Sequence, residues 1–399
     1  MHKSIPAACL LTLFSACNNN NSQQAKAPVL QEETISRPDN FAADVDFLGA
    51  FTVPAVMKDS TSKSAIAVVA SWQGRVMTST VADDGRSFGF LHYGIIENGK
   101  QFHFSTFGGE DRLLFGPLPD STTLSPNDSL PATLLPDPLR DTALLRQAPA
   151  AKGAVTVEGD ALLPNTKNNP LTAHITRTIT LLSRRDLHNY LGADIHRSIH
   201  AVGFHSDNTL LNTGSQRWDT AHGTTAIRIR GMFPVSPKSV GIIPLRKGGK
   251  VNTGAQMPKE RFLIKNDVAF FRADGNFDME LGLQQASALN FMGIYDPERK
   301  LLTVIQFTMP RHPALYLGET TTDARAEVLT IRNNGPANTI AKGRFLEVQS
   351  TSPAALLKPK GRMQHFHRTI HLEGSEKHLG EITKKIFGVN LKEITTALP

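Results

Sequence analysis

The stretch RFLEVQSTSPAALLKPKGRMQHFHRTIHLEG, residues 344–374, contains two β-strand patterns joined by a segment rich in Pro, Gly and Lys. Successive side chains of a strand point to opposite faces, so Glu347 interrupts an otherwise apolar strand, and His365, His367 and His371 share one face of the next strand. The other face of that second strand is apolar. The histidine row is therefore either the polar face of an amphipathic strand or part of a zinc site that needs a ligand from elsewhere.

The rest of the chain shows the same period-two pattern in short segments bounded by Gly, Pro, Asn or Asp. Such segments are typical of β-strands, and DPER at 296–299 predicts the turn of a hairpin between two apolar arms. Helix signals come at the end of the chain, where Ser375 can cap a helix that ends at Gly388. The sequence thus predicts an all-β domain over residues 41–374 and a helical cap over residues 375–399. The expected strands include 64–70, 74–81, 88–96 and 101–107.

The N-terminus has the pattern of a secretory signal. A short basic start precedes the apolar run Ile5–Phe14, which is too short to span a bilayer, and the following FSAC ends at Cys17. We expect residues 1–16 to be removed, Cys17 to be lipidated, and residues 17–40 to form a flexible tether that holds the protein to the outer membrane, facing the periplasm. An ordinary signal-peptidase site with an unmodified Cys17 is the alternative.

Cysteine content limits the chemistry of the expected mature protein. The only other cysteine, Cys9, lies inside the signal. After its removal no disulfide can form, and thiol catalysis and Cys-ligated zinc are excluded. We expect no cofactor and no metal.

The segment from Pro117 to Lys152 breaks the strand pattern, because it contains seven prolines among Ser, Thr and Asp. A loop of this length either has a function, such as covering a site, or has no fixed structure.

The chain carries a formal net charge of +7 and has a pI near 9.4. Its basic residues occur in scattered pairs without interleaved aromatic residues or a nucleic-acid-binding motif, and an exported protein is not expected to meet nucleic acid. Attraction to anionic glycans such as uronic-acid polymers is one interpretation of this charge, and a merely solvated basic surface is the other.

Several motifs indicate a family resemblance. LEVQSTSPAALLKPKG resembles the C-terminal part of galactose mutarotase-like β-supersandwich proteins. Together with WQGRVMTST, FGGEDRLLFGP, LLNTGSQRW, GTTAIRIRGMF, YDPERKLLTV and HFHRTIHLEG, it makes the chain similar, over roughly residues 45–395, to an uncharacterised family of bacterial lipoproteins with that fold. The chain departs from that family's expected pattern at Leu118 and Arg228, so its ligand could differ or its activity could be lost.

The resemblance implies a catalytic pair. Glu347 occupies the place of the glutamate that acts as general base on the anomeric hydroxyl in mutarotase-like enzymes, where a histidine acts as the acid. His222 and His103 are the candidates for that acid. A structural role remains open for Glu347, as a partner of Arg112 or Arg75.

The loop FGGEDRLLFGP supplies the other expected contacts. Its glycines allow close approach of the backbone to a ligand, and Glu110, Asp111 and Arg112 offer the mixture of acceptors and donors that sugar hydroxyls need. Asp111 could instead pair with Arg112 or cap a turn. Trp218 is the expected stacking platform, and the predicted substrate-binding set is completed by Arg75 and Arg228.

These observations predict an envelope lipoprotein that binds or processes carbohydrate through a mutarotase-like pocket, by proton transfer at an anomeric centre. A non-catalytic envelope scaffold or partner-binding module is the alternative function.

Overall fold

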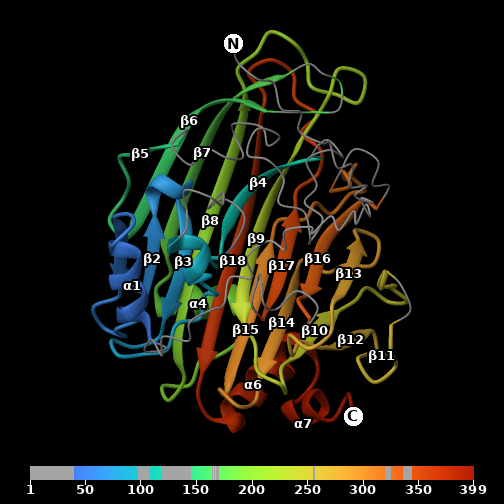
Figure 1. Ribbon diagram of the computed structural model, residues 1–399. Coiled ribbons are helices and arrows are strands. Elements are labelled where there is room, and N and C mark those ends of the chain that lie inside the picture. The colour runs from blue at the N-terminus through green and yellow to red at the C-terminus, as the bar shows by residue number, and fades with distance from the viewer. Residues whose placement is uncertain are drawn as a thin grey trace, which may run out of the picture.

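The computed structural model describes residues 40–97, 108–117, 145–163, 165, 167, 170–254, 257–319, 325–335 and 344–399. This part of the chain is mostly β-structure arranged in three sheets, with short helices at its margins (Figure 1). The predicted all-β class with C-terminal helices is therefore confirmed. No helix within the described ranges has the length and hydrophobicity to cross a membrane.

The largest sheet has ten strands in the order β11-β12-β10-β14-β15-β18-β8-β7-β6-β5, and all of its neighbouring strands are antiparallel. Its members are β5 (Arg146–Ala148), β6 (Ala154–Leu163), β7 (Leu171–Leu181), β8 (His200–Asn212), β10 (Val240–Pro244), β11 (Phe262–Lys265), β12 (Val268–Arg272), β14 (Phe291–Asp296), β15 (Leu301–Phe307) and β18 (Arg362–Glu373).

Two smaller sheets cover one face of the ten-stranded sheet. The five-stranded sheet has the order β13-β16-β17-β9-β4, with β4 (Arg112–Gly116), β9 (Ala226–Pro234), β13 (Met279–Gln284), β16 (Glu327–Asn333) and β17 (Phe345–Thr351). The three-stranded sheet consists of β1 (Pro54–Lys58), β2 (Ala65–Val69) and β3 (Arg75–Thr80). The helices α1 (Phe41–Gly49), η1 (Ala70–Trp72) and α2 (Tyr93–Glu97) lie near it in sequence.

The core lies between these layers. Alternate residues of the five-stranded sheet, such as Ile331 and Val348, pack against Met292 and Ile305 of the ten-stranded sheet. A second cluster joins β4 and β9 to β6, β7 and β8, and a third joins the three-stranded sheet to the same strands. Burial of apolar side chains from facing sheets is therefore what holds the sandwich together.

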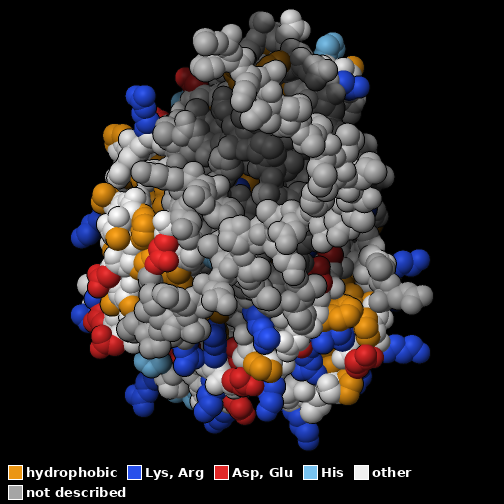
Figure 2. Space-filling view, in the orientation of Figure 1, with side chains coloured by type: hydrophobic (Ala, Val, Ile, Leu, Met, Phe, Trp, Pro, Cys, Tyr) orange, Lys and Arg blue, Asp and Glu red, His pale blue; other side chains and the backbone are white. Residues whose placement is uncertain are grey.

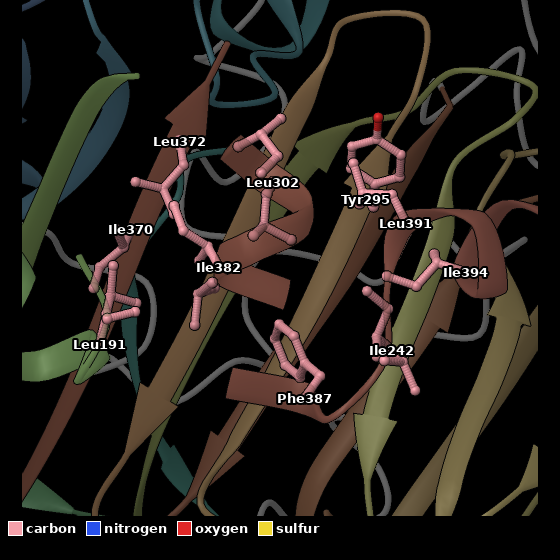
Figure 3. Close-up of a cluster of buried hydrophobic side chains, with 14 of the residues drawn as sticks. Leu191, Ile242, Tyr295, Leu302, Ile370, Leu372, Ile382, Phe387, Leu391 and Ile394 are labelled. Carbon is pink, nitrogen blue, oxygen red and sulfur yellow. The ribbon is translucent and has the colours of Figure 1, made fainter. Parts of the chain in front are cut away.

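The opposite face of the ten-stranded sheet is closed in part by helices. Leu302, Ile370 and Leu372 project there against α6 (Glu376–Phe387) and α7 (Leu391–Thr395), as Figure 3 shows, and α4 (Arg184–Leu191) packs into the same cluster. The predicted cap is confirmed, because Ser375 occupies the N-cap of α6 and Gly388 ends it in the left-handed conformation, at φ 74°. The DPER turn also joins β14 to β15 as predicted.

Two local predictions were wrong. Residues 88–96, expected to form a strand, cross between two sheets instead, because Phe88 N donates to Ser79 O and Phe90 N donates to Met232 O, and the segment ends in α2. The histidine row of β18 does not face solvent, because it points into the space between the sheets. The expected signal, Cys17, the tether up to residue 39, the strand at 101–107 and most of the Pro-rich segment lie outside the described residues.

Candidate functional site

One face of the five-stranded sheet carries a dense group of charged and polar side chains. Cross-strand partners of an antiparallel sheet share a face, and the register places Arg112 opposite Arg230, which lies opposite Gln349. Further along, Glu347 lies opposite Arg332. The alternate residues of these strands belong to the core, so this face points away from the ten-stranded sheet. We call it the arginine-glutamate face, and it consists of Arg112, Arg228, Arg230, Glu280, Arg332, Glu347 and Gln349.

Glu347 lies near the centre of this face. Its Oε1 is 3.4 Å from Arg230 Nε, and its side chain is 13% exposed. The same guanidinium donates from Nε and Nη2 to Gln349 Oε1, at 3.0 and 2.7 Å, and from Nη2 to Glu319 Oε1 at 2.5 Å. Arg230 thus holds two carboxylates and an amide together beside solvent.

A small polar pocket opens next to this group. Arg228 donates from Nη2 to the carbonyl oxygens of Leu317, at 3.0 Å, and Gly318. Its guanidinium passes over Gly116, where an added Cβ would come within 2.7 Å of Arg228 Nε. The pocket is lined by Arg228, Glu280, Leu317, Glu319, Arg325, Glu327 and Thr330.

Two of these carboxylates are held by neighbouring side chains. Glu327 accepts a hydrogen bond from Asn252 Nδ2 at 3.0 Å. Glu280 pairs with both Arg325 and Arg332, the latter at 2.7 Å.

Crowded arginines dominate the electrostatics of the site. Burial lowers the pKa of Arg112 well below its usual value, and the positive charges of Arg75 and Arg230 add to this effect. Burial also lowers the pKa of Arg332, but Glu347, Glu280 and Glu319 outweigh it and leave the pKa raised. For Glu319, burial raises the pKa, and the arginines beginning with Arg230 outweigh it, so the net shift is downward.

The FGGEDR loop meets this face through its glycines. Gly108 N lies 3.2 Å from Sδ of Met232, and Met232 N donates to Gly109 O at 2.9 Å. Met232 is the cross-strand partner of Glu347. Both glycines have positive φ, and a Cβ on Gly109 would lie 2.9 Å from Arg75 Cδ. The glycine backbone therefore makes a close approach, but its partner is another part of the protein and not a ligand, as had been expected.

Glu110 and Asp111 do not line the face, which corrects their expected role in binding. Both are fully buried and point into the sandwich. Asp111 Oδ1 accepts from Arg177 Nη2 at 2.5 Å, and its Oδ2 accepts from Ser206 Oγ at 2.8 Å. Asp111 therefore ties β4 to β7 and β8.

Glu110 is part of a second buried chain of polar groups. Its Oε2 is 2.7 Å from His371 Nε2, and His371 Nδ1 is 2.8 Å from Thr303 Oγ1. This chain connects the FGGEDR loop to β15 and β18.

Three further expectations are also corrected. Trp218 is 2% exposed and packs in the core with Leu163 and Ile227, so its ring is not available to stack on a sugar. Arg75 is buried behind the face, where burial and the charge of Arg177 lower its pKa to about 9. The third concerns His222.

His222 lies in an exposed turn, where Asp219 Oδ1 accepts from its backbone N at 2.8 Å. That turn precedes β9, which begins at Ala226. Met232, the residue of β9 that lies opposite Glu347, is six residues farther along, a distance of about 20 Å in an extended strand. His222 therefore does not lie beside Glu347. The other expected acid, His103, falls outside the described residues.

The buried histidines of β18 form a polar pair around a serine. Ser350 Oγ lies 3.0 Å from His365 Nε2 and 2.9 Å from His367 Nδ1, and both rings are fully buried. In the described ranges, no group of three His, Cys, Asp or Glu side chains is arranged to hold a metal. Burial lowers the pKa of both histidines to about 3.

His92 was not among the expected residues, and it belongs to a segment that contacts the five-stranded sheet through Phe90. It follows Phe90 by two residues, and the ring of Phe90 contacts the ring of Phe345 at a centroid distance of 4.8 Å. Phe345 lies on the same face as Glu347, two residues before it, and His92 is buried. Nothing in the strand-like sequence around His92 indicated that this segment would contact the five-stranded sheet.

Arg230, Gln349, Arg332, Glu280 and Glu319 were also missed. Arg230 and Gln349 left a usable signal, because RIR and EVQ place polar residues at alternate positions of otherwise apolar strands. Glu319 comes from a loop, and only the fold brings it to Arg230.

Residues 39–398 match a family described as "Family of unknown function (DUF6786)". No curated protein is significantly similar to the chain in sequence. Among solved structures, the chain is similar to the Slr1438 protein from Synechocystis sp. PCC 6803, with 12% identity and a TM-score of 0.49 over 81% of this chain and 96% of that one. A putative aldose 1-epimerase from Escherichia coli K12 has 11% identity and a TM-score of 0.47, over 80% of this chain and 99% of its own. A galactose mutarotase-like protein from Lactobacillus casei ATCC 334 has 10% identity, with the same TM-score and coverage.

Proposed function

The chain belongs to this family of unknown function, and we propose from its own residues that it binds a saccharide on the arginine-glutamate face, with Glu347 as general base at the anomeric centre. The observation that carries the proposal is the grouping of Glu347, Gln349 and Arg230 on a partly exposed sheet surface.

This grouping suits a polyhydroxylated ligand. A sugar ring presents hydroxyls that both donate and accept, and the face offers guanidinium donors, carboxylate acceptors and the amide of Gln349 within a few ångströms. These groups lie on strands of a sheet, which keeps them in position. The ligand would therefore meet a preorganised array.

Glu347 is the group best placed to remove a proton from an anomeric hydroxyl. Its side chain reaches solvent, whereas Glu110 and Asp111 are committed to buried partners. We propose His92 as the acid that protonates the ring oxygen, in place of His222, because Phe90, two residues before it, donates its backbone N–H to the carbonyl oxygen of Met232, the cross-strand partner of Glu347. No metal is needed for this proton transfer.

A Glu347→Gln variant should lower the rate of mutarotation by a factor of about 10²–10⁴, the usual contribution of general base catalysis, while sugar binding stays similar. Polarimetry or NMR exchange spectroscopy on a panel of aldoses measures the rate. His92→Gln should lower it as well, and His222→Gln is the matched control that keeps the full rate. A Glu347→Gln protein with the full rate would show that this carboxylate is structural.

A non-catalytic scaffold is the second candidate function. It is favoured by the extent to which the charged groups already pair with one another, as Glu280 does with Arg325 and Arg332. Thermal-shift screening against a panel of mono- and oligosaccharides separates the two. Stabilisation by a sugar supports the binding site, and its absence across the panel supports the scaffold.

We also propose that Cys17 is lipidated and holds the folded domain to the outer membrane. A Cys17→Ser variant should then move from the membrane fraction to the soluble fraction, because one residue carries the anchor. Fractionation of cells that express each form measures this. If the variant stays with the membranes, the lipoprotein assignment fails.

A further inference from the structure

Strand β11 is an edge strand with exposed apolar side chains. It ends the order of the ten-stranded sheet and pairs with β12, and no strand of the described chain lies along its other side. Leu263 is 38% exposed and Ile264 is 40% exposed. Figure 1 places β11 at the lower right margin of the molecule, where the space-filling view shows hydrophobic side chains with basic ones beside them (Figure 2). An exposed apolar edge strand is a place at which another extended chain can pair.

Both faces of β11 carry exposed apolar groups. Successive residues of a strand point to opposite faces, so Phe262 and Ile264 share one face, and Phe262 packs against the cluster between the sheets. Leu263 points the other way, and its cross-strand partner Phe270 belongs to the cluster under the helical cap. The five-stranded sheet and the helices therefore cover the inner strands but leave both sides of β11 partly open.

Two residues of β11 direct their backbone groups away from the sheet. In an antiparallel pair, every second residue exchanges hydrogen bonds with the neighbouring strand, and the residues between them point outward. Arg272 N donates to Arg261 O at 2.9 Å, so Arg261 faces β12, and so do the residues two and four positions after it. The N–H and C=O groups of Phe262 and Ile264 therefore point outward, and no partner for them occurs within the described ranges.

Lysines flank β11 at both ends. Two of them lie in the loop after β10, which contacts the turn after β11, because Leu245 N donates to Asp267 O at 2.8 Å and Gly248 N donates to Asp267 Oδ1 at 3.0 Å. A third lies three residues before β11, and the fourth ends it. All four are exposed and form no ion pair within the described ranges, and the same stretch contains the carboxylates of Glu260 and Asp267. The four are Lys247, Lys250, Lys259 and Lys265.

These features favour an extended acidic segment over the other possible occupants of this edge. A second copy of the chain would bring the same lysines to both ends of the edge, and like charges on paired strands are destabilising. A lipid surface would cover the apolar side chains, but hydrocarbon offers no hydrogen bonds to outward N–H and C=O groups. An added strand of another protein supplies these bonds, and acidic side chains on it meet opposite charge at the lysines.

We propose that β11 is a docking edge, to which an extended segment of a partner protein with acidic and apolar side chains adds as a further strand of the large sheet. The backbone of the segment pairs with Phe262 and Ile264, its apolar side chains cover Leu263 and Ile264, and its carboxylates approach the flanking lysines. The inference does not depend on the proposed binding of a saccharide.

Selection from a displayed library of short random peptides, with the folded protein as bait, tests the proposal. We expect the enriched peptides to alternate acidic and apolar residues and to bind more weakly as salt is raised. Hydrogen exchange gives a direct readout, because a bound selected peptide should slow the exchange of the Phe262 and Ile264 amides.

Substitutions in β11 assign the binding to this edge. Ile264→Pro removes the outward N–H but keeps the bonds to β12, and proline is tolerated on edge strands. Ile264→Asp keeps the N–H and places a negative charge on the edge. Each should weaken a selected peptide at least about tenfold by fluorescence anisotropy, with thermal melting as the check on folding. Leu162→Asp is the matched control on the inner strand β6, where the leucine is 58% exposed, and should leave binding unchanged.

The lysines are tested in the same assay. Lys265→Gln should weaken the selected peptide about threefold, as expected for one exposed charge pair, and should reduce the salt dependence. Lys238→Gln is its matched control, because Lys238 is exposed and precedes β10, at the opposite end of that strand from the loop that contacts the β11 turn.

The outcomes that overturn the proposal are distinct. It fails if no peptide is enriched, or if the enriched peptides bind both Ile264 variants as tightly as the wild type. A dimer in analytical ultracentrifugation that Ile264→Asp dissociates assigns the edge to a second copy instead. Binding to vesicles of anionic lipid that the same variant abolishes assigns it to a lipid surface.

Discussion

Replacing Asp111 with asparagine is expected to reduce the free energy of unfolding by about 3–5 kcal/mol, the usual cost of breaking a buried ion pair. The carboxylate accepts from Arg177 at 2.5 Å and from Ser206 at 2.8 Å, and both members of the ion pair are fully buried. An amide retains one acceptor, but it leaves the Arg177 charge uncompensated and turns an NH₂ group toward one of two donors. Denaturant unfolding followed by circular dichroism measures the loss.

Asp83→Asn is the matched control. It breaks a pair with Lys58 in which both side chains are 47% exposed, and exposed pairs contribute only about 0–1 kcal/mol. Replacing both buried partners, as in Asp111→Leu with Arg177→Met, should cost less than the sum of the single changes, because no lone charge remains. If Asp111→Asn costs no more than Asp83→Asn, the pair does not stabilise the junction of the sheets.

Acid should destabilise the protein through the two buried histidines of β18. His365 and His367 have a pKa of about 3 in the folded state, caused first by burial, against about 6.5 in the unfolded chain. Between these values the unfolded chain binds protons that the folded protein does not. Stability is therefore fully present above pH 6.5 and is lost as the pH falls toward 3.

The size of this effect can be checked at two pH values. Each histidine contributes up to about 1.4 kcal/mol per pH unit inside the window, so the pair should account for about 5 kcal/mol between pH 7 and pH 4.5. Urea unfolding at these two values should show that His367→Gln loses about half of that contribution relative to the wild type. An independent His365→Gln variant should behave in the same way, because both rings share Ser350. An unchanged pH dependence in both variants would contradict the buried-neutral assignment.

Much of the architecture could be predicted from local sequence preferences. The DPER hairpin, the all-β class and the helix from Ser375 to Gly388 depend on local preferences, such as turn residues, β-branched runs and caps. The failure at residues 88–96 has a tertiary cause, since that segment satisfies its backbone groups on two different sheets.

The candidate site was predictable only in part. Glu347, Arg112 and Arg228, which the sequence indicated as candidate site residues, do share one face of the five-stranded sheet. Glu110 and Asp111 directly precede Arg112, yet they turn inward, because buried His371 and Arg177 on distant strands provide their partners. Such partners come from more than 60 residues away, and nothing in a local pattern identifies them.

By itself, the sequence determined which side chains share a face of each strand, because that depends only on the two-residue period of an extended chain. The tertiary structure alone decided what each face meets. The histidine face of β18 looks like a solvent face in sequence, but it is buried because β17 packs over it, while the apolar face is buried by α6 and α7. Long-range packing decides burial, and burial sets the charge state of a histidine, the strength of an ion pair and the access of a ligand to Glu347.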